Sequence, residues 1–476
     1  MSPFRYLTAR GRGAVQKRID AGNCNGPQHI DLLFYRHSMK LRDWSLRRWA
    51  VVIALIFLLP LIGLRLHLKW RVHHAVAELR EQGLPTTWDE ANRQYAVVPP
   101  EQNIGPRLTN LFQNLPFPSA LLRSNIPIVG FAPTPKAGEP WPDLMRSASG
   151  EYLAGIRENL DKLYGVIDEG LCRYPGELGP LPWTHSGIWS AGSKISLDSR
   201  HALEVGEYPR SARANRALFK LADTLYAEPA WIGQLVRCAI TSVAVIDCQH
   251  LLSLDACEGP ELTSLQQAIR NSSSQSSLRH VIDGERVSFL ESIDPDNGFI
   301  PLDFNIDYQP DTHGEYWERL KVLLYRMTGL ADQDVLWFLQ NSRKLQVQLG
   351  DKLASHQSAL AAWTNFTPEG AGLRFTYWSK QHVAVDDRTI GKHLELHKKL
   401  RAADAALAVA QYRLQHDGKL PASLDELVPE YLEAVPVEPQ SDKPFELIVT
   451  TDGYGIGRGT PVFTVKLKSD PNANPK

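Results

Sequence analysis

The densest group of potential metal ligands in the chain is an acidic stretch at residues 292–315. It carries six carboxylates and one imidazole, at Asp294, Asp296, Asp303, Asp307, Asp311, His313 and Glu315. Spaced carboxylates on a loop can supply the oxygen ligands that Ca²⁺ binds. Asp303 and Asp307 match two positions of an EF-hand loop, but Tyr308 stands where the sharp turn of that loop needs glycine. Two interpretations stay open: an acidic surface loop, or an irregular metal site built on Asp303, Asp307, Asp311 and His313.

A second candidate is the pair of histidines at His393 and His397, which lie one helical turn apart. This spacing allows two imidazoles to chelate zinc or copper. A zinc-protease helix needs glutamate directly after the first histidine, whereas here Glu395 falls between the two on another face. Lysines at positions 392, 398 and 399 surround the pair. The pattern therefore favours a solvent-exposed helix stripe over a metal site.

Two further segments have residue types that occur in hydrolases. His185 and Ser186 are adjacent in the run WTHSGIW, which lacks the G-x-S-x-G turn that exposes a catalytic serine. We expect a packed aromatic loop there, because neighbours in sequence rarely face each other. The run Gly284–Arg286, within an expected helix over Leu278–Ile293, favours a local ion pair over a catalytic acid.

The five cysteines are too few for a disulfide-rich scaffold and form no C-x-x-C motif. Cys248 and Cys257 flank an expected helix end and are the first candidates for a disulfide. The chain contains neither a phosphate-binding Walker loop nor a dinucleotide fingerprint, so we expect no cofactor. Its formal net charge of −1 argues against a general nucleic-acid binder.

The elements that position these residues begin with a long apolar segment near the N-terminus. From Trp49 to Leu64 the chain reads WAVVIALIFLLPLIGL, without a charge, and extension to Leu68 gives 20 residues. At about 1.5 Å per residue, this length matches the roughly 30 Å hydrocarbon core of a bilayer. We therefore predict a transmembrane helix over residues 49–68, with the lipid bilayer as its partner.

The ends of the segment fit a membrane-spanning helix. Trp49 and Trp70 bracket it, as interfacial aromatic residues do. Arg65 and Lys69 lie where their long side chains can reach the headgroups. Pro60 is tolerated in such a helix where its freed carbonyl finds a partner.

Basic residues set the expected orientation. Residues 1–71 contain 13 lysines and arginines against 3 acids, whereas acids exceed bases in the remainder. Five basic residues precede the segment between Arg36 and Arg48, which predicts a cytoplasmic N-terminus and an exported C-terminal part. No A-x-A-like site follows the apolar run, so we expect an uncleaved signal anchor in the inner membrane. Residues 1–38 form a disordered cytoplasmic tail, or Met39 is the true start.

The length of 476 residues and ordinary composition, with 43% hydrophobic residues, predict a globular chain of several parts. The expected fold is mainly α-helical, and apolar residues at helical spacing over 218–225 and 232–246 predict an αα-hairpin. After the basic tail (1–48) and the membrane helix we expect a stalk and Pro-rich irregular segment (69–150) and a multi-helix extracytoplasmic domain (151–400). A small α+β module (401–468) and a disordered tail (469–476) follow. In that module we expect a strand over Phe445–Thr450, a turn carrying four spaced glycines between Gly453 and Gly459, and a strand over Val462–Leu467.

The last module resembles a known family. Ala406–Pro439 reads ALAVAQYRLQHDGKLPASLDELVPEYLEAVPVEP. This run resembles the post-helix segment of the major pseudopilin of bacterial type II secretion. The chain also resembles a broad set of uncharacterised, signal-anchored bacterial envelope proteins, in which Glu81–Glu90 (EQGLPTTWDE) and Ala227–Val236 (AEPAWIGQLV) have counterparts. The resemblance implies an exported α+β module with no activity attached.

The chain departs from pseudopilins in two respects. No prepilin-peptidase site precedes Trp49, and Tyr454–Thr460 (YGIGRGT) contains no carboxylate where pseudopilins bind calcium. Neither pilus assembly nor calcium binding is therefore expected. The sequence predicts a non-catalytic, membrane-anchored envelope protein that contacts other envelope proteins. The alternative is an exported metal-dependent hydrolase that uses the acidic stretch. The oligomeric state is not determined by these patterns.

Overall fold

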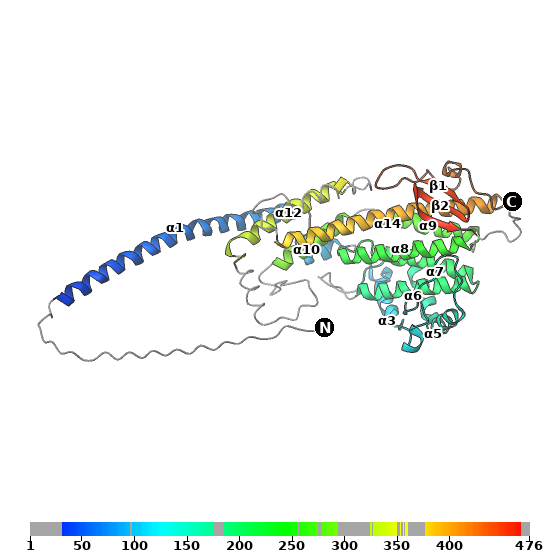
Figure 1. Ribbon diagram of the computed structural model, residues 1–476, viewed down its shortest axis with the longest axis horizontal. Helices are drawn as coiled ribbons and strands as arrows, with labels where there is room; N and C mark the ends of the chain where they lie inside the picture. The colour runs from blue at the N-terminus through cyan, green and yellow to red at the C-terminus, as the bar shows by residue number, and fades with distance from the viewer. Residues whose placement is uncertain are drawn as a thin grey trace, which may run out of the picture. The chain divides into compact units, whose positions relative to one another are not determined.

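The computed structural model describes residues 31–95, 98–174, 184–254, 257–274, 278–293, 324–349 except 326, four single positions between 353 and 359, and 377–467. This part of the chain is mainly α-helical, with a small antiparallel sheet near the C-terminus (Figure 1). The mainly helical fold class is therefore confirmed.

The elements follow in chain order. The helices are α1 (Asp31–Glu81), α2 (Trp88–Gln94), η1 (Pro100–Gln102), α3 (Gly105–Gln113), α4 (Ala120–Arg123), α5 (Asp143–Asp168), α6 (Thr184–Glu204), α7 (Tyr208–Asp223), α8 (Trp231–Ser253), α9 (Gly259–Ser274), α10 (Arg279–Ile293), α12 (Leu330–Gln348), α14 (Tyr377–Gln415) and η3 (Leu424–Leu427). The strands are β1 (Glu446–Thr450), β2 (Gly453–Arg458) and β3 (Thr460–Lys466).

The chain divides into two compact units, residues 1–64 and 65–476. In the first unit, the described part of α1 is apolar and exposed: every described large apolar side chain from Val51 to Leu64 has an exposed fraction of at least 46%. Arg65, Lys69 and Trp70, at the end of the predicted membrane segment, are also exposed. Pro60 lies inside the helix, as expected.

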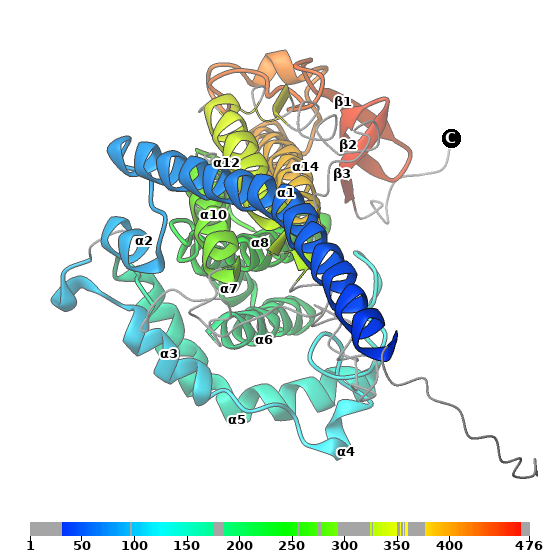
Figure 2. The same ribbon diagram turned by 90° about the vertical axis from the view of Figure 1, so that its left-hand side faces the viewer.

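The second unit is built on antiparallel helices around one large core. The predicted αα-hairpin over residues 218–246 is formed by α7 and α8. Figure 2 shows α8, α7 and α6 one below the next, with α5 running across beneath α6. Pro209 stands in the first turn of α7, where its missing N–H does no harm. The small residues between Ala402 and Ala410 are fully or almost fully buried, which lets α14 pack closely against α8 and α9.

One described helix, α8, is long and apolar enough to span a membrane by length and composition, but most of it is buried inside the protein. Its buried face carries polar residues, including Arg237, Thr241 and Asp247. Asp247 accepts a hydrogen bond of 2.6 Å from Arg200 on α6. A helix with paired polar groups toward protein and apolar groups around them is a core helix.

The predicted stalk over residues 69–150 is instead packed against the helices. The last turns of α1 contribute Val72, Val76 and Leu79 to a cluster with Phe289 of α10 and Phe338 of α12. Farther along, the Pro-rich segment adds a set of buried side chains to the main core, namely Ile104, Leu108, Phe112, Ile126 and Trp141. Prolines prevent long helices here, but they do not prevent burial.

The C-terminal sheet corrects a second expectation. The spaced glycines predicted a turn, yet Gly453, Gly455 and Gly457 lie in β2, the central strand, which pairs antiparallel with β1 and β3. A Cβ at Gly455 would lie 2.7 Å from the Pro461 side chain, and one at Gly457 would lie 2.4 Å from the Thr460 carbonyl. Glycine is required by close approach of the third strand. The strands predicted over 445–450 and 462–467 are confirmed as β1 and β3.

The C-terminal module does not form a separate domain. The boundary predicted at residue 401 falls inside α14, and the sheet packs on α8 and α14. Gln249 of α8 donates to the Thr464 carbonyl at 2.6 Å, and the Tyr454 hydroxyl donates to the Ala406 carbonyl at 3.1 Å. The segments predicted as stalk, helical domain and module therefore belong to one compact unit. The tail after residue 467 lies outside the described residues.

Candidate functional site

The predicted metal ligands Asp303, Asp307, Asp311 and His313 lie outside the described residues, so that site stays a prediction. Within the described part of the chain, no group of three or more histidine, cysteine, aspartate or glutamate side chains is arranged to hold a metal ion.

His393 and His397 are not on a solvent-exposed stripe. Their exposed fractions are 1% and 0%, and Glu395 of the same helix faces solvent. The rings of His356 and His393 are 5.5 Å apart between centroids, and those of His393 and His397 are 4.4 Å apart. Burial, then the nearby Arg237 and Arg401, lowers the pKa of His397 to about 3. The flanking lysines misled the sequence interpretation, because they are exposed or half-buried while the histidines between them are buried.

From Thr184 onward the WTHSGIW run is helical instead of a loop, because it forms the first turns of α6. His185 is buried, with Nε2 4.0 Å from Glu228 Oε1, while Ser186 is exposed. The two adjacent side chains therefore point apart, and no nucleophile–base pair forms between them. In α10, the local ion pair joins Arg286 to Asp283 at 2.8 Å.

Cys172, Cys238, Cys248 and Cys257 are free thiols, so the predicted Cys248–Cys257 disulfide is not formed in this structure. Burial raises the pKa of all four, to about 12 for Cys257. A buried thiol with a raised pKa is a weak nucleophile. These cysteines therefore act as small apolar core residues.

The most developed site is a cavity of about 300 Å³, here called the Tyr95 pocket. Three segments line it: α2 with the turn before it, the α7–α8 turn, and the first turn of α10. The lining residues are Pro85, Ala91, Gln94, Tyr95, Tyr226, Ala227, Pro229, His280 and Asp283. A mostly apolar cavity with a few convergent polar groups is the usual form of a ligand site.

Local capping holds α2 in the pocket wall. Thr87 caps the helix by accepting from the Glu90 amide at 3.2 Å, and Glu90 accepts from the Thr86 amide at 2.7 Å. Arg80, in the last turn of α1, forms an ion pair with Glu90 at 2.9 Å. Gln94 donates to the Gly83 carbonyl at 2.7 Å. This reciprocal capping fixes the α1–α2 turn and hence Pro85, Ala91 and Tyr95.

The opposite wall is the tight α7–α8 turn. The Gln234 side chain donates to the backbone carbonyls of Leu225 and Glu228 at 2.7 and 2.9 Å. These hydrogen bonds satisfy two buried carbonyl groups of the turn. A Cβ at Gly284 would lie 2.1 Å from the Pro229 carbonyl oxygen, and one at Gly233 would lie 2.4 Å from the Glu228 side chain. Both glycines are therefore required for α10 and α8 to approach this turn closely.

Buried titratable groups surround the pocket. The Tyr95 hydroxyl donates to Glu228 Oε2 at 3.1 Å, and burial raises the pKa of both groups. Burial, then the nearby Arg237, lowers the pKa of His280 to about 4, so its ring is neutral at pH 7. Burial also raises the pKa of Asp283, against the opposing effect of Arg286. Perturbed groups at a cavity are typical of functional sites.

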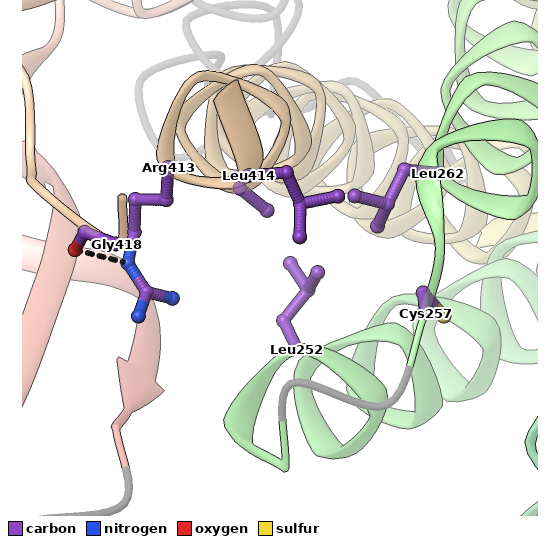
Figure 3. A pocket seen from close by; sticks show the side chains of 7 residues that line it. Leu252, Cys257, Leu262, Arg413, Leu414 and Gly418 are labelled. Carbon is purple, nitrogen blue, oxygen red and sulfur yellow. Dashed lines mark hydrogen bonds between the residues drawn. The ribbon is translucent and has the colours of Figure 1, made fainter. Parts of the chain in front are cut away.

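A second cavity of about 260 Å³ lies between α8, α9 and the end of α14 (Figure 3). Leu252, Leu262 and Leu414 point toward one another across it. Arg413 donates to the Gly418 carbonyl at 3.3 Å at one side. Aliphatic side chains form much of its wall, and Cys257, Arg413 and Gly418 complete it. A third hollow, on one face of α12, is lined by Gln340, Arg343, Lys344, Val347 and Gln348.

Sequence reasoning missed one buried base. Lys194 of α6 has an exposed fraction of 1%, donates to Ser190 Oγ at 2.6 Å, and lies 4.2 Å from the Phe117 ring centroid. Burial lowers the pKa of Lys194 to about 8. The Ser-x-x-x-Lys spacing places both groups on one helix face, a signal that the sequence did contain. None of the three cavities is lined by this pair.

Comparison of the chain with protein-family models, with curated proteins and with solved structures finds no match. The site must therefore be interpreted from its own chemistry. Two segments noted for their resemblance to envelope proteins, Glu81–Glu90 and Ala227–Val236, lie far apart in sequence. Both contribute to the Tyr95 pocket, through Pro85 and through Ala227 with Pro229.

Proposed function

We propose that this chain is a single-pass membrane-anchored protein whose large C-terminal unit lies on the extracytoplasmic side and acts by binding instead of catalysis. The observation that carries the proposal is the exposed apolar surface of α1. Ile56, Phe57 and Leu59 have exposed fractions between 61% and 68%, in a run without a charge from Val51 to Leu64. Exposure of this surface to water costs about 25 cal/mol per Å² of apolar area, whereas contact with the hydrocarbon of a bilayer carries no such cost.

Binding is favoured over catalysis by the Tyr95 pocket. Among the described residues that line it, there is no serine, threonine, cysteine or lysine that could act as a nucleophile. Its tyrosine hydroxyl at Tyr95 is engaged with Glu228. A rigid, mostly apolar cavity with neutral and acidic groups suits recognition of a ligand or of a segment of an envelope partner.

Cell fractionation and reporter fusions test this proposal. The full chain should sediment with membranes and resist extraction by alkaline carbonate, which removes peripheral proteins. A C-terminal alkaline phosphatase fusion should be active, and a C-terminal green fluorescent protein fusion should be dark, because the first folds only outside the cytoplasm. A soluble chain, or a fluorescent C-terminal fusion, would contradict the anchor or its orientation.

A further inference from the structure

Two residues that line the Tyr95 pocket, His280 and Asp283, each keep a hydrogen-bond acceptor without a donor in the described ranges. The His280 ring donates to the Tyr226 backbone, and its Nε2 has no hydrogen-bond partner among the described residues. Asp283 Oδ1 accepts from Arg286 and from Gln346, each at 2.8 Å. These contacts leave Asp283 Oδ2 without a hydrogen-bond partner in the described part of the chain. The lone pair of His280 Nε2 is buried without a donor, which is unfavourable, and a ligand that donates a hydrogen bond would satisfy it.

Charge around the pocket argues against an ionic ligand. Asp283 is already paired with Arg286, and Arg237 is close enough to His280 to lower its pKa. Arg173 lies over the Tyr95 ring at 4.9 Å. A cation would therefore meet a carboxylate that is already neutralised and three guanidinium groups nearby. An anion would face the lone pairs of His280 and Asp283, which repel it.

The rest of the lining suits a flat ligand with apolar faces. The Tyr226 ring lies edge-on to His280, with 5.8 Å between centroids, and Pro85, Ala91, Ala227 and Pro229 add apolar surface. A sugar ring has this character: its C–H groups form apolar faces, and its hydroxyls, at the edge, donate hydrogen bonds. The cavity volume of about 300 Å³ is at the lower end for ligand sites, which favours one or two rings.

We propose that the Tyr95 pocket binds a neutral saccharide, whose hydroxyls donate to His280 Nε2 and to the free oxygen of Asp283 and whose ring face packs on the tyrosines and prolines. The inference rests on the proposed binding role and names its ligand class. It does not depend on the membrane anchor.

Calorimetric titration of the detergent-solubilised full chain tests the saccharide. The probes are glucose, N-acetylglucosamine and its β-1,4-linked dimer, with cyclohexylamine and benzoate as cationic and anionic comparisons. We expect saturable binding of at least one sugar and weaker or no binding of the two ions. Failure of all three sugars at millimolar concentration would overturn the proposal. Tighter binding of either ion would overturn the assignment of a saccharide ligand but would still support a binding role for the pocket. Neither result changes what membrane fractionation says about the proposed anchor.

Substitutions of pocket residues test whether the sugar binds in this pocket. His280→Phe keeps a ring beside Tyr226 but removes the acceptor, and we expect about tenfold weaker binding, as for one lost hydrogen bond. Ala227→Leu should weaken binding further by filling the cavity. Gln94→Leu on the exposed rim should weaken it roughly threefold, and its matched control, exposed Gln340→Leu on α12, should not. Unchanged affinity in well-folded His280→Phe and Ala227→Leu would refute the location.

Discussion

Two segments of this chain are apolar enough to span a membrane, but one is exposed and the other is mostly buried. In α1, the described large apolar side chains from Val51 to Leu64 are 46–68% exposed, and the run contains no charge. In α8, most of the apolar window is buried, and Arg237, Thr241 and Asp247 are buried with it. Hydropathy measures how much apolar surface a helix has, and only the fold shows what covers that surface.

The difference lies in the partners of the polar groups. Asp247 of α8 is paired with Arg200, and burial still raises its pKa. Such groups can stay in a core because neighbouring helices supply partners. The α1 run has no polar side chain to be satisfied, so lipid alone could surround it. Side-chain chemistry therefore distinguishes the α1 run, the proposed anchor, from the core helix α8, and four experiments test this distinction.

Charging the exposed face of α1 should have the largest effect. We expect the double variant Ile56→Arg/Leu58→Arg to leave the membrane fraction almost completely, because each arginine at the centre of a spanning helix costs about 2.5–3.5 kcal/mol. The measurement is immunoblotting of membrane and soluble fractions. Val347→Arg, at another exposed apolar position on α12, is the control and should stay in the membrane. Unchanged sedimentation of the double variant would refute the anchor.

Breaking the buried ion pair between Asp247 and Arg200 should have the second-largest effect. Asp247→Ala leaves Arg200 without its carboxylate in the core, and we expect the free energy of unfolding to fall by about 3–5 kcal/mol. Urea denaturation of the detergent-solubilised chain measures it. Glu207→Ala breaks the exposed pair with Arg157 and should cost at most about 1 kcal/mol. Equal losses would mean that α8 does not lie in a dry core.

Acid should destabilise the unit that contains α8. Burial lowers the pKa of His250 and His397 to about 3 and that of His280 to about 4. Between these values and the ordinary pKa near 6.5 the unfolded chain binds more protons, so stability is complete above about pH 6.5 and is lost as the pH falls. Each group contributes a slope of up to about 1.4 kcal/mol per pH unit.

Urea denaturation at a series of pH values checks this slope. His397→Leu removes one of the three groups and should flatten the decline below pH 6.5. His416→Gln, at an exposed position, should leave it unchanged. A stability that stays level down to pH 4.5 would show that these histidines are not buried as neutral rings.

The smallest expected effect is a gain in stability. Lys194 is buried as deeply as the polar residues of α8, but its nitrogen has a hydroxyl partner at Ser190 in place of a carboxylate. Because burial lowers its pKa from 10.5 to about 8, its charge is costly at pH 7. We expect Lys194→Met to raise the free energy of unfolding by about 1–3 kcal/mol at pH 7, and the gain to shrink as the pH rises from 8 to 10.5. A loss at pH 7 would mean that the Ser190 hydrogen bond and the Phe117 contact outweigh desolvation.

Periodicity was enough to predict the bundle, because apolar residues at helical spacing need a partner surface whatever that surface is. The α7–α8 hairpin, α10 and the outer strands of the sheet follow from local pattern alone. Local pattern failed at the spaced glycines of β2, which looked like a turn. Glycine is needed at these positions because β3 approaches β2 closely, and this contact joins two segments of the chain.

Local sequence was sufficient to predict the apolar run of α1 and the mainly helical fold, since these depend on residues close along the chain. Contacts between distant segments make α8 a core helix, bury His393 and His397 although lysines flank them in sequence, and pack residues 69–150 against the helices. The same contacts assemble the Tyr95 pocket, from segments about 50 to 200 residues apart. Burial and pKa depend on which distant groups come together, and no spacing within one segment contains that information.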